Sequence, residues 1–127
     1  MGNVPGAGQR VSAEVASWPG VDAGAGPRGE LAFRVHGREI GHLHGDHAVH
    51  YFFPKDIWLE LHEEGRIAEH PVFPGRQGPA AHAIEDEADV REVIELLRLN
   101  YDHVLARRLA RSGAAARRAA VAAATEG

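Results

Sequence analysis

A long amphipathic helix constrains the fold of this chain more than any other feature of its sequence. Residues 86–111 read "DEADVREVIELLRLNYDHVLARRLAR", and their apolar side chains recur at spacings of three and four. Asp86 suits the N-cap position, and Glu87 and Asp89 favour the positive end of a helix. We predict a helix that begins near Glu87 and buries one face against a sheet. The residues of its apolar stripe are Val90, Val93, Ile94, Leu97, Tyr101, Val104, Leu105 and Leu109.

The segments before this helix carry the pattern of an antiparallel sheet. Alternating residues in "ELAFRVHG" predict a half-buried strand, and "HG" at 36–37 suits a tight reversal into a second strand, "REIGHLH". The β-branched and aromatic residues of "HAVHYFFP" predict a third strand, and "IAEHPVFPG" and "AAHAIE" predict two short ones. By contrast, "DAGAGPRG" at 22–29 reads as a Gly/Pro loop.

Two shorter helices complete the expected fold. One starts at Ser12 and is stopped by Pro19, and the other follows Pro54 in "PKDIWLELHEEGR" and ends at Gly65. We therefore predict an α+β fold. It has a small, mainly antiparallel sheet of about five strands, with a long C-terminal helix and one or two shorter helices packed on it.

The length of 127 residues allows one domain. Both ends of the chain are poor in large apolar residues. We expect residues 1–10 to be a disordered N-terminus and residues 11–111 to form the single domain. Residues 112–127, rich in Ala and Arg, are expected to be flexible or a frayed helix. The expected assembly is a monomer or a homodimer.

Composition and charge exclude several classes of function. The net charge of −4 argues against a nucleic-acid partner. The absence of cysteine excludes disulfides, thiolate zinc sites and cysteine nucleophiles. No apolar run approaches the roughly 20 residues that span a bilayer, and the first residues lack the pattern of a signal peptide. We expect a cytoplasmic protein that does not bind membranes.

Residues 41–50, "GHLHGDHAVH", concentrate histidines around an aspartate. Because alternate side chains on a strand share a face, His42 and His44 should point the same way, beside Arg38 and Ile40. Two imidazoles about 6–7 Å apart along a strand can hold one ion or one anionic ligand. The alternative is that these histidines are ordinary polar residues on an open sheet face.

The string "HLHGDH" also matches the zinc-binding H-x-H-x-D-H pattern of the metallo-β-lactamase fold. That fold needs a chain about twice as long, and its motif leads into a helix, whereas a strand is predicted here. A metal-dependent hydrolase of the zinc type that uses the same residues remains open as an alternative. Its ligands would be His42, His44, Asp46 and His47.

Five segments resemble the luciferase-domain family, a group of small proteins named for its relation to the fungal luciferases. They are "WPGV" (18–21), "REIGHLHGD" (38–46), "FFP" (52–54), "EEGRIAEHPVFPG" (63–75) and "EADVREVIELLRLNYD" (87–102). The resemblance runs from about Trp18 to Arg108, and "GREIGHLHGD" with "LLRLNYD" is its most specific part. It implies an α+β domain in which the H-x-H strand, Pro54 and the last helix frame a common pocket.

The resemblance also implies a function. Fungal luciferases oxidise a hydroxylated pyrone with molecular oxygen, without metal or flavin. By this resemblance the chain is a small-ligand pocket protein, and its expected activity is cofactor-free oxidation of an aromatic or enolic metabolite. His42 and His44 would be the catalytic acid/base groups, since the charge of imidazole changes near neutral pH. A non-catalytic interaction domain is a further alternative.

Seven other residues are candidates for contact with the ligand. Phe52 and Trp58 would supply an apolar wall, and Arg98 would either hold a carboxylate or phosphate or form a surface ion pair with Glu95 or Asp102. The full set is Arg38, Asp46, His50, Phe52, Trp58, His70 and Arg98.

Overall fold

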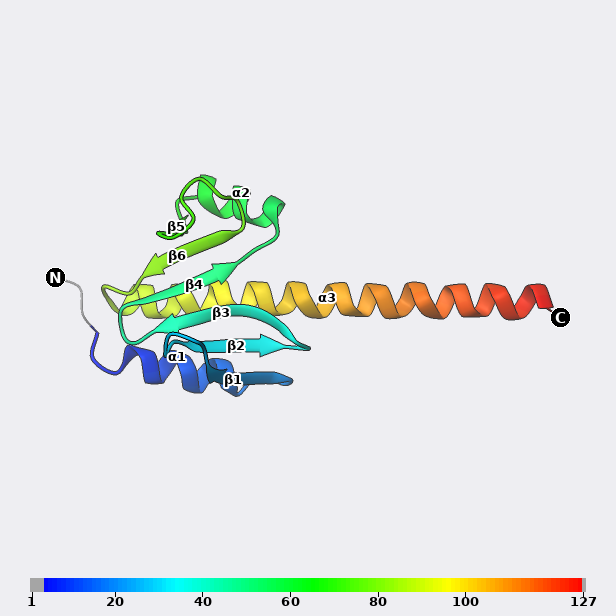
Figure 1. Cartoon of the computed structure of the whole chain (residues 1–127), viewed down its shortest axis with the longest axis horizontal. Helices are drawn as coiled ribbons and strands as arrows, with labels where there is room; N and C mark the ends of the chain where they lie inside the picture. Colours follow the sequence, from blue (N-terminus) through cyan, green and yellow to red (C-terminus); the bar gives the residue numbers. More distant parts are fainter. Residues whose placement is uncertain (1–3, 127) are drawn as a thin grey trace.

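The structure, a computed structural model, describes residues 4–126. Its strands form one antiparallel sheet in the order β1-β2-β3-β4-β6-β5 (Figure 1). The strands are β1 (Val21–Ala25), β2 (Leu31–Val35), β3 (Arg38–His44), β4 (Ala48–Phe52), β5 (Ala68–Glu69) and β6 (Pro79–Ala83). The helices are α1 (Ala7–Ala16), α2 (Lys55–Glu63) and α3 (Glu87–Glu126). The predicted α+β fold is confirmed.

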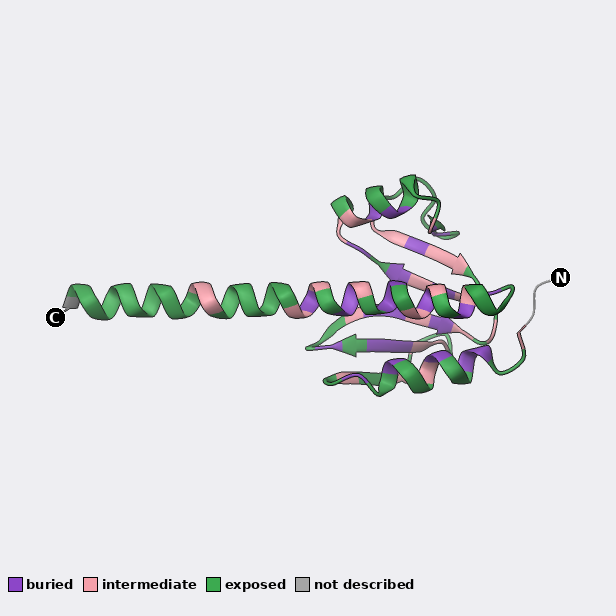
Figure 2. Ribbon diagram, turned by 180° about the vertical axis from the view of Figure 1, so that it is seen from behind, coloured by how far each residue is buried: buried purple, intermediate pink, exposed green. Residues whose placement is uncertain are grey.

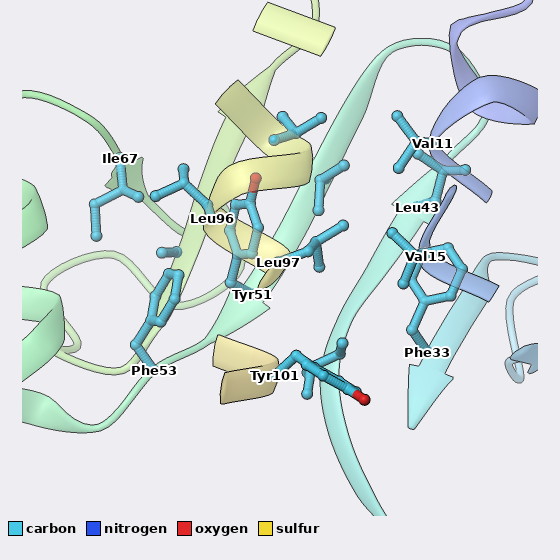
Figure 3. Packing of buried hydrophobic residues seen from close by; sticks show 14 of the residues in the cluster. Val11, Val15, Phe33, Leu43, Tyr51, Phe53, Ile67, Leu96, Leu97 and Tyr101 are labelled. Carbon is cyan, nitrogen blue, oxygen red and sulfur yellow. The ribbon is translucent and has the colours of Figure 1, made fainter. Parts of the chain in front are cut away.

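Helices α1 and α3 pack side by side on one face of the sheet (Figures 1 and 2). Helix α2 lies at the β5–β6 side, where the indole nitrogen of Trp58 donates a hydrogen bond to the carbonyl of Pro79. The hydrophobic core fills the space between the helices and the sheet. Figure 3 shows Leu97 of α3 beside Tyr51 of β4, and Val15 of α1 beside Phe33 of β2. The opposite sheet face is left to polar and aromatic side chains.

Helix α3 begins at Glu87 as predicted, and its apolar stripe is buried over the first half of its length. Val93, Leu97 and Tyr101 are fully or almost fully buried, and Leu96 joins them. Burial ends near Val104, where the helix leaves the sheet, and Leu109 is 73% exposed (Figure 2). Residues 112–126 continue the same helix, and the side chains of residues 112–125 are mostly exposed. No helix within the described range is long and apolar enough to cross a membrane.

Two elements near the N-terminus differ from expectation. The start of the predicted Gly/Pro loop is part of β1, an edge strand paired with β2 from Val21↔Val35 to Ala25↔Leu31. Strand pairing at the edge of a sheet is made by backbone hydrogen bonds, so the small residues of this segment can still form a strand. Helix α1 begins at Ala7 rather than at Ser12, and Ala7 and Gly8 are buried in it.

Candidate functional site

A β-bulge in β3 decides which side chains reach the open face of the sheet. Phe33 pairs with Gly41 and Arg34 pairs with Glu39, so Ile40 has no partner in β2. The extra residue changes the alternation of faces, because a bulge places two residues opposite one. Ile40 is fully buried in the core, so the expectation that it lies beside His42 is wrong. Glu39 takes the place on the open face instead.

A side chain from α3 forms hydrogen bonds to the backbone at the bulge. Asn100 is only 2% exposed, and its amide nitrogen donates hydrogen bonds to the carbonyls of Ile40 (2.9 Å) and Phe52 (3.0 Å). A buried amide needs such partners, and these two carbonyls belong to the ends of adjacent strands. The helix therefore holds the irregular start of β3 against the end of β4.

Four histidines meet on the open face, and we call them the histidine cluster: His42, His44, His50 and His70. His42 and His44 come from β3, and His50 comes from β4, where it pairs directly with His42. The ring centroids lie 4.8 Å apart for His42 and His44, 4.2 Å for His44 and His50, and 5.2 Å for His42 and His50. His70, just after β5, packs its ring 4.3 Å from that of His50.

The hydrogen bonds of the cluster indicate which ring nitrogens are available. Nδ1 of His42 lies 2.9 Å from Oε2 of Glu39, and because a carboxylate accepts, Nδ1 carries the proton and Nε2 keeps a lone pair. Nδ1 of His70 accepts from the backbone N–H of Val72 at 3.1 Å, so neutral His70 carries its proton on Nε2. Nε2 of His44 is buried and has no hydrogen-bond partner among residues 4–126.

Burial and crowding favour the uncharged forms of His44, His50 and His70, because they lower the pKa of each. Burial, and then the nearby His44, His70 and His42, lowers the pKa of His50 from 6.5 to about 4. Burial is also the largest cause that lowers the pKa of His44 and of His70, with His42 as the next cause in both. Neutral imidazoles are the form that binds metal ions or accepts a proton.

One nitrogen from each of His42, His44 and His50 can be chosen so that all three lie within 4.8 Å of one another. Within the described chain, this is the one group of His, Cys, Asp or Glu side chains that converges closely enough to hold a metal ion. His70 is not part of it, and its protonated Nε2 explains why it suits a donor role better than a ligand role.

Comparison with known proteins supports the resemblance seen in the sequence. The family model described as Luciferase domain matches residues 37–100, half of the chain. The chain belongs to the luciferase-domain family. The matched range includes β3, β4, the whole histidine cluster and α3 as far as Asn100. Searches among curated proteins and among solved structures found no match.

Several residues expected at the site of this luciferase-domain protein do lie at the histidine cluster. His50 and His70 complete the cluster, and the ring of Phe52 lies 5.9 Å from that of His42. Arg38 does not lie there: it precedes the bulge, pairs with the buried Val35, and lines a cavity together with Phe52. Glu39 was missed by sequence reasoning, because a regular strand would put it on the face opposite His42.

Other expected residues lie elsewhere. His47 is exposed in the β3–β4 turn, and Trp58 is 4% exposed in the core. Arg98 packs over Trp18 and Tyr101 and forms the surface ion pair with Asp102. The structure therefore does not bring these side chains to His42 and His44.

Asp46 has a structural contact that accounts for its place in the motif. Its carboxylate accepts hydrogen bonds from the backbone N–H groups of Gly6 (3.2 Å) and Gly8 (2.7 Å), at the start of α1. A Cβ on Gly8 would lie 2.5 Å from the carbonyl oxygen of Gly45, so the helix approaches this turn very closely. Asp46 thus serves as a helix cap supplied from a distant part of the chain.

Replacing Asp46 with alanine is expected to lower the free energy of unfolding by about 0.5–2 kcal/mol, the usual cost of losing a helix cap. The variant should bind ligand or metal at the histidine cluster as the native chain does. Urea melts measure the first effect and titrations the second. A loss of metal affinity without a loss of stability would return Asp46 to the site.

Acid should destabilise the fold through the cluster. In the unfolded chain these histidines take up protons below about pH 6.5, whereas His50 in the folded chain resists protonation down to about 4. The unfolded state then binds more protons, so stability is full above pH 6.5 and falls as the pH drops towards 4. After allowance for solvent screening we expect a loss of about 1–2 kcal/mol. Urea melts from pH 7.5 to 4.5 should show it, and the His50→Asn variant should show less.

Proposed function

We propose that His42, His44 and His50 bind one divalent transition-metal ion, and that the chain is a metal-dependent enzyme for a small aromatic or enolic metabolite. The observation that carries this proposal is the convergence of three ring nitrogens within 4.8 Å, with Glu39 behind His42. Catalytic zinc sites commonly have three protein ligands and one open position, and three histidines are one such set. A carboxylate that orients a ligating histidine is the usual outer partner of such a site.

The geometry fits a metal ion after a small contraction. Nitrogens bound to tetrahedral zinc lie about 2.0–2.1 Å from the ion and therefore roughly 3.3 Å from one another. The nitrogens of the three histidines lie within 4.8 Å of one another, so they need to approach by at most about 1.5 Å. Side-chain rotation can supply this, because the rings stand on two paired strands whose backbone need not move. The unsatisfied Nε2 of His44 would gain a partner.

The residues around the proposed metal ion suit the ionisation of a bound water or hydroxyl group. A bound divalent ion lowers the pKa of a water or hydroxyl group that it holds. His70 carries a proton on Nε2 and can donate it to a developing negative charge, while Glu39 keeps His42 in the orientation of a ligand. Phe52 offers an aromatic surface beside His42 for the apolar part of a substrate. The supported step is ionisation of water or of an enol hydroxyl.

A second candidate is the metal-free enzyme expected from the fungal luciferases. The Glu39–His42 hydrogen bond favours it, since a carboxylate that holds Nδ1–H leaves Nε2 oriented to accept a proton as a general base. His42 would then remove the proton of an enol directly, with His44 beside it. The cytoplasmic location and the monomeric or dimeric state remain predictions.

Metal analysis separates the two candidates. The chain is purified without chelator, its metal content is measured by mass spectrometry, and chelator-treated protein is titrated with Zn²⁺ and with Co²⁺. We expect one ion per chain, a rise in melting temperature with Zn²⁺, and visible Co²⁺ bands typical of four ligands. Absence of saturable binding for either ion would reject the metal proposal and favour the metal-free candidate.

A further inference from the structure

A cavity of about 590 Å³ lies where α3 leaves the sheet, beside the end of β4. It is walled by the start of β3, the end of β4, the loop between β5 and β6, and the part of α3 from Asn100 to Arg111. Figure 1 shows these segments around the point where α3 projects past the strands. The volume is in the range of small-molecule sites, which span roughly 300–1,000 Å³.

The rim of this cavity is strongly basic. Arg38, Arg76, Arg107 and Arg111 line it, all four are exposed, and none has an ion-pair partner within residues 4–126. The one acidic residue in the lining, Glu39, is engaged with His42 at 2.9 Å and lies 3.9 Å from Arg34. Four exposed guanidinium groups without acidic partners around one cavity create a positive potential that attracts an anion, and arginine binds carboxylate and phosphate well.

The interior of the cavity is mostly apolar, with Asn100 and His103 as polar residues in its lining. Phe53 and Val104 in the lining are 5% and 7% exposed, and Phe52 and Phe73 add partly exposed aromatic rings. The amide nitrogen of Asn100, also in the lining, is already used by two backbone carbonyls. The surface thus offers apolar contact inside and positive charge at the mouth.

We infer that this cavity binds an anionic amphiphile, with a carboxylate or phosphate head at the arginine rim and an apolar body over Phe53 and Val104. Arginine recognises both kinds of head group through paired N–H donors. The apolar lining by Phe53 and Val104 favours a ligand with an apolar body over free phosphate. The inference goes beyond the proposed metal site and does not need it. The two sites adjoin, because Phe52 and Glu39 contact both the cavity and His42.

Binding of decanoate tests the inference, with decyl phosphate as the second anion and decanol as the neutral analogue. The full chain, treated with chelator, is titrated by calorimetry below the micelle concentration of each compound. We expect one saturable site for at least one of the anions and binding of decanol weaker by about tenfold or more, since a charged hydrogen bond is worth this much. The better of the two anions identifies the head group.

Two pairs of substitutions on α3 provide a matched comparison. Arg107→Gln with Arg111→Gln removes two rim charges and should weaken binding of the anion by about tenfold or more. Arg117→Gln with Arg118→Gln removes the same charge from the same helix, outside the cavity, and should leave affinity unchanged. Phe73→Ala, at a residue 39% exposed, should weaken both the anion and decanol.

Three results would overturn the inference. They are equal affinities for decanoate and decanol with no preference for decyl phosphate, equal losses in the two arginine pairs, or no saturable binding. The His50→Ala variant separates this inference from the proposed metal site. It should keep its affinity for the anion even where zinc binding is lost.

Discussion

Replacing His50 with alanine is expected to weaken zinc binding by about a hundredfold or more. Loss of an outer partner of a metal ligand typically costs about 10–100-fold, and loss of a ligand itself should cost at least the upper part of that range. His47→Ala is the matched control, because His47 lies in the turn just before β4 but is exposed and outside the group that converges. Competition with a chromophoric chelator measures both affinities.

Glu39→Gln should fall between these two variants, with a loss of about 10–100-fold, because it keeps the shape but removes the charge behind His42. Without bound metal, each of the three variants should have a melting temperature within a few degrees of that of the native chain. If His47→Ala weakens binding and His50→Ala does not, the alternative zinc site with Asp46 and His47 is correct. If neither changes zinc binding, the ion binds elsewhere.

Replacing Leu97 with alanine is expected to lower the free energy of unfolding by about 2–5 kcal/mol, as for other fully buried leucines. Leu97 is 0% exposed and lies at the centre of the contact between α3 and the sheet (Figure 3). Its truncation leaves a cavity that the rigid strands beneath cannot fill. Urea-induced unfolding measures the effect. A loss of only a few tenths of a kcal/mol would mean that this face of α3 is not packed as described.

Gly41 is the partner of Leu97 and allows a second test of the same contact. A Cβ at Gly41 would lie 2.7 Å from Cδ2 of Leu97 and 2.8 Å from the carbonyl oxygen of His50. Gly41→Ala should therefore cost about 1–3 kcal/mol by overpacking. In the double variant, the smaller residue 97 relieves the first contact but not the second, so the combined loss should be less than the sum. Strict additivity would show that the two residues do not touch.

Local patterns along the chain determined most helices and strands of the fold and two residues of the site, His42 and His44. Apolar spacing predicted α3 and the burial of Val93, Leu97 and Tyr101, because helical periodicity depends only on neighbouring residues. Strand alternation likewise predicted that His42 and His44 share a face. The same reasoning extended the stripe to Leu109, which is exposed, because the spacing says nothing about where the sheet beneath the helix ends.

Only the tertiary structure decided which groups join those two histidines. Pairing of β3 with β4 places His50 opposite His42, and strand register is a relation between segments that no single segment encodes. The bulge at Ile40 depends on pairing with β2 and on support from Asn100, and it brings Glu39 to the open face. Asp46 looked like a ligand because it is adjacent in sequence, but the start of α1, which is distant in sequence, binds its carboxylate.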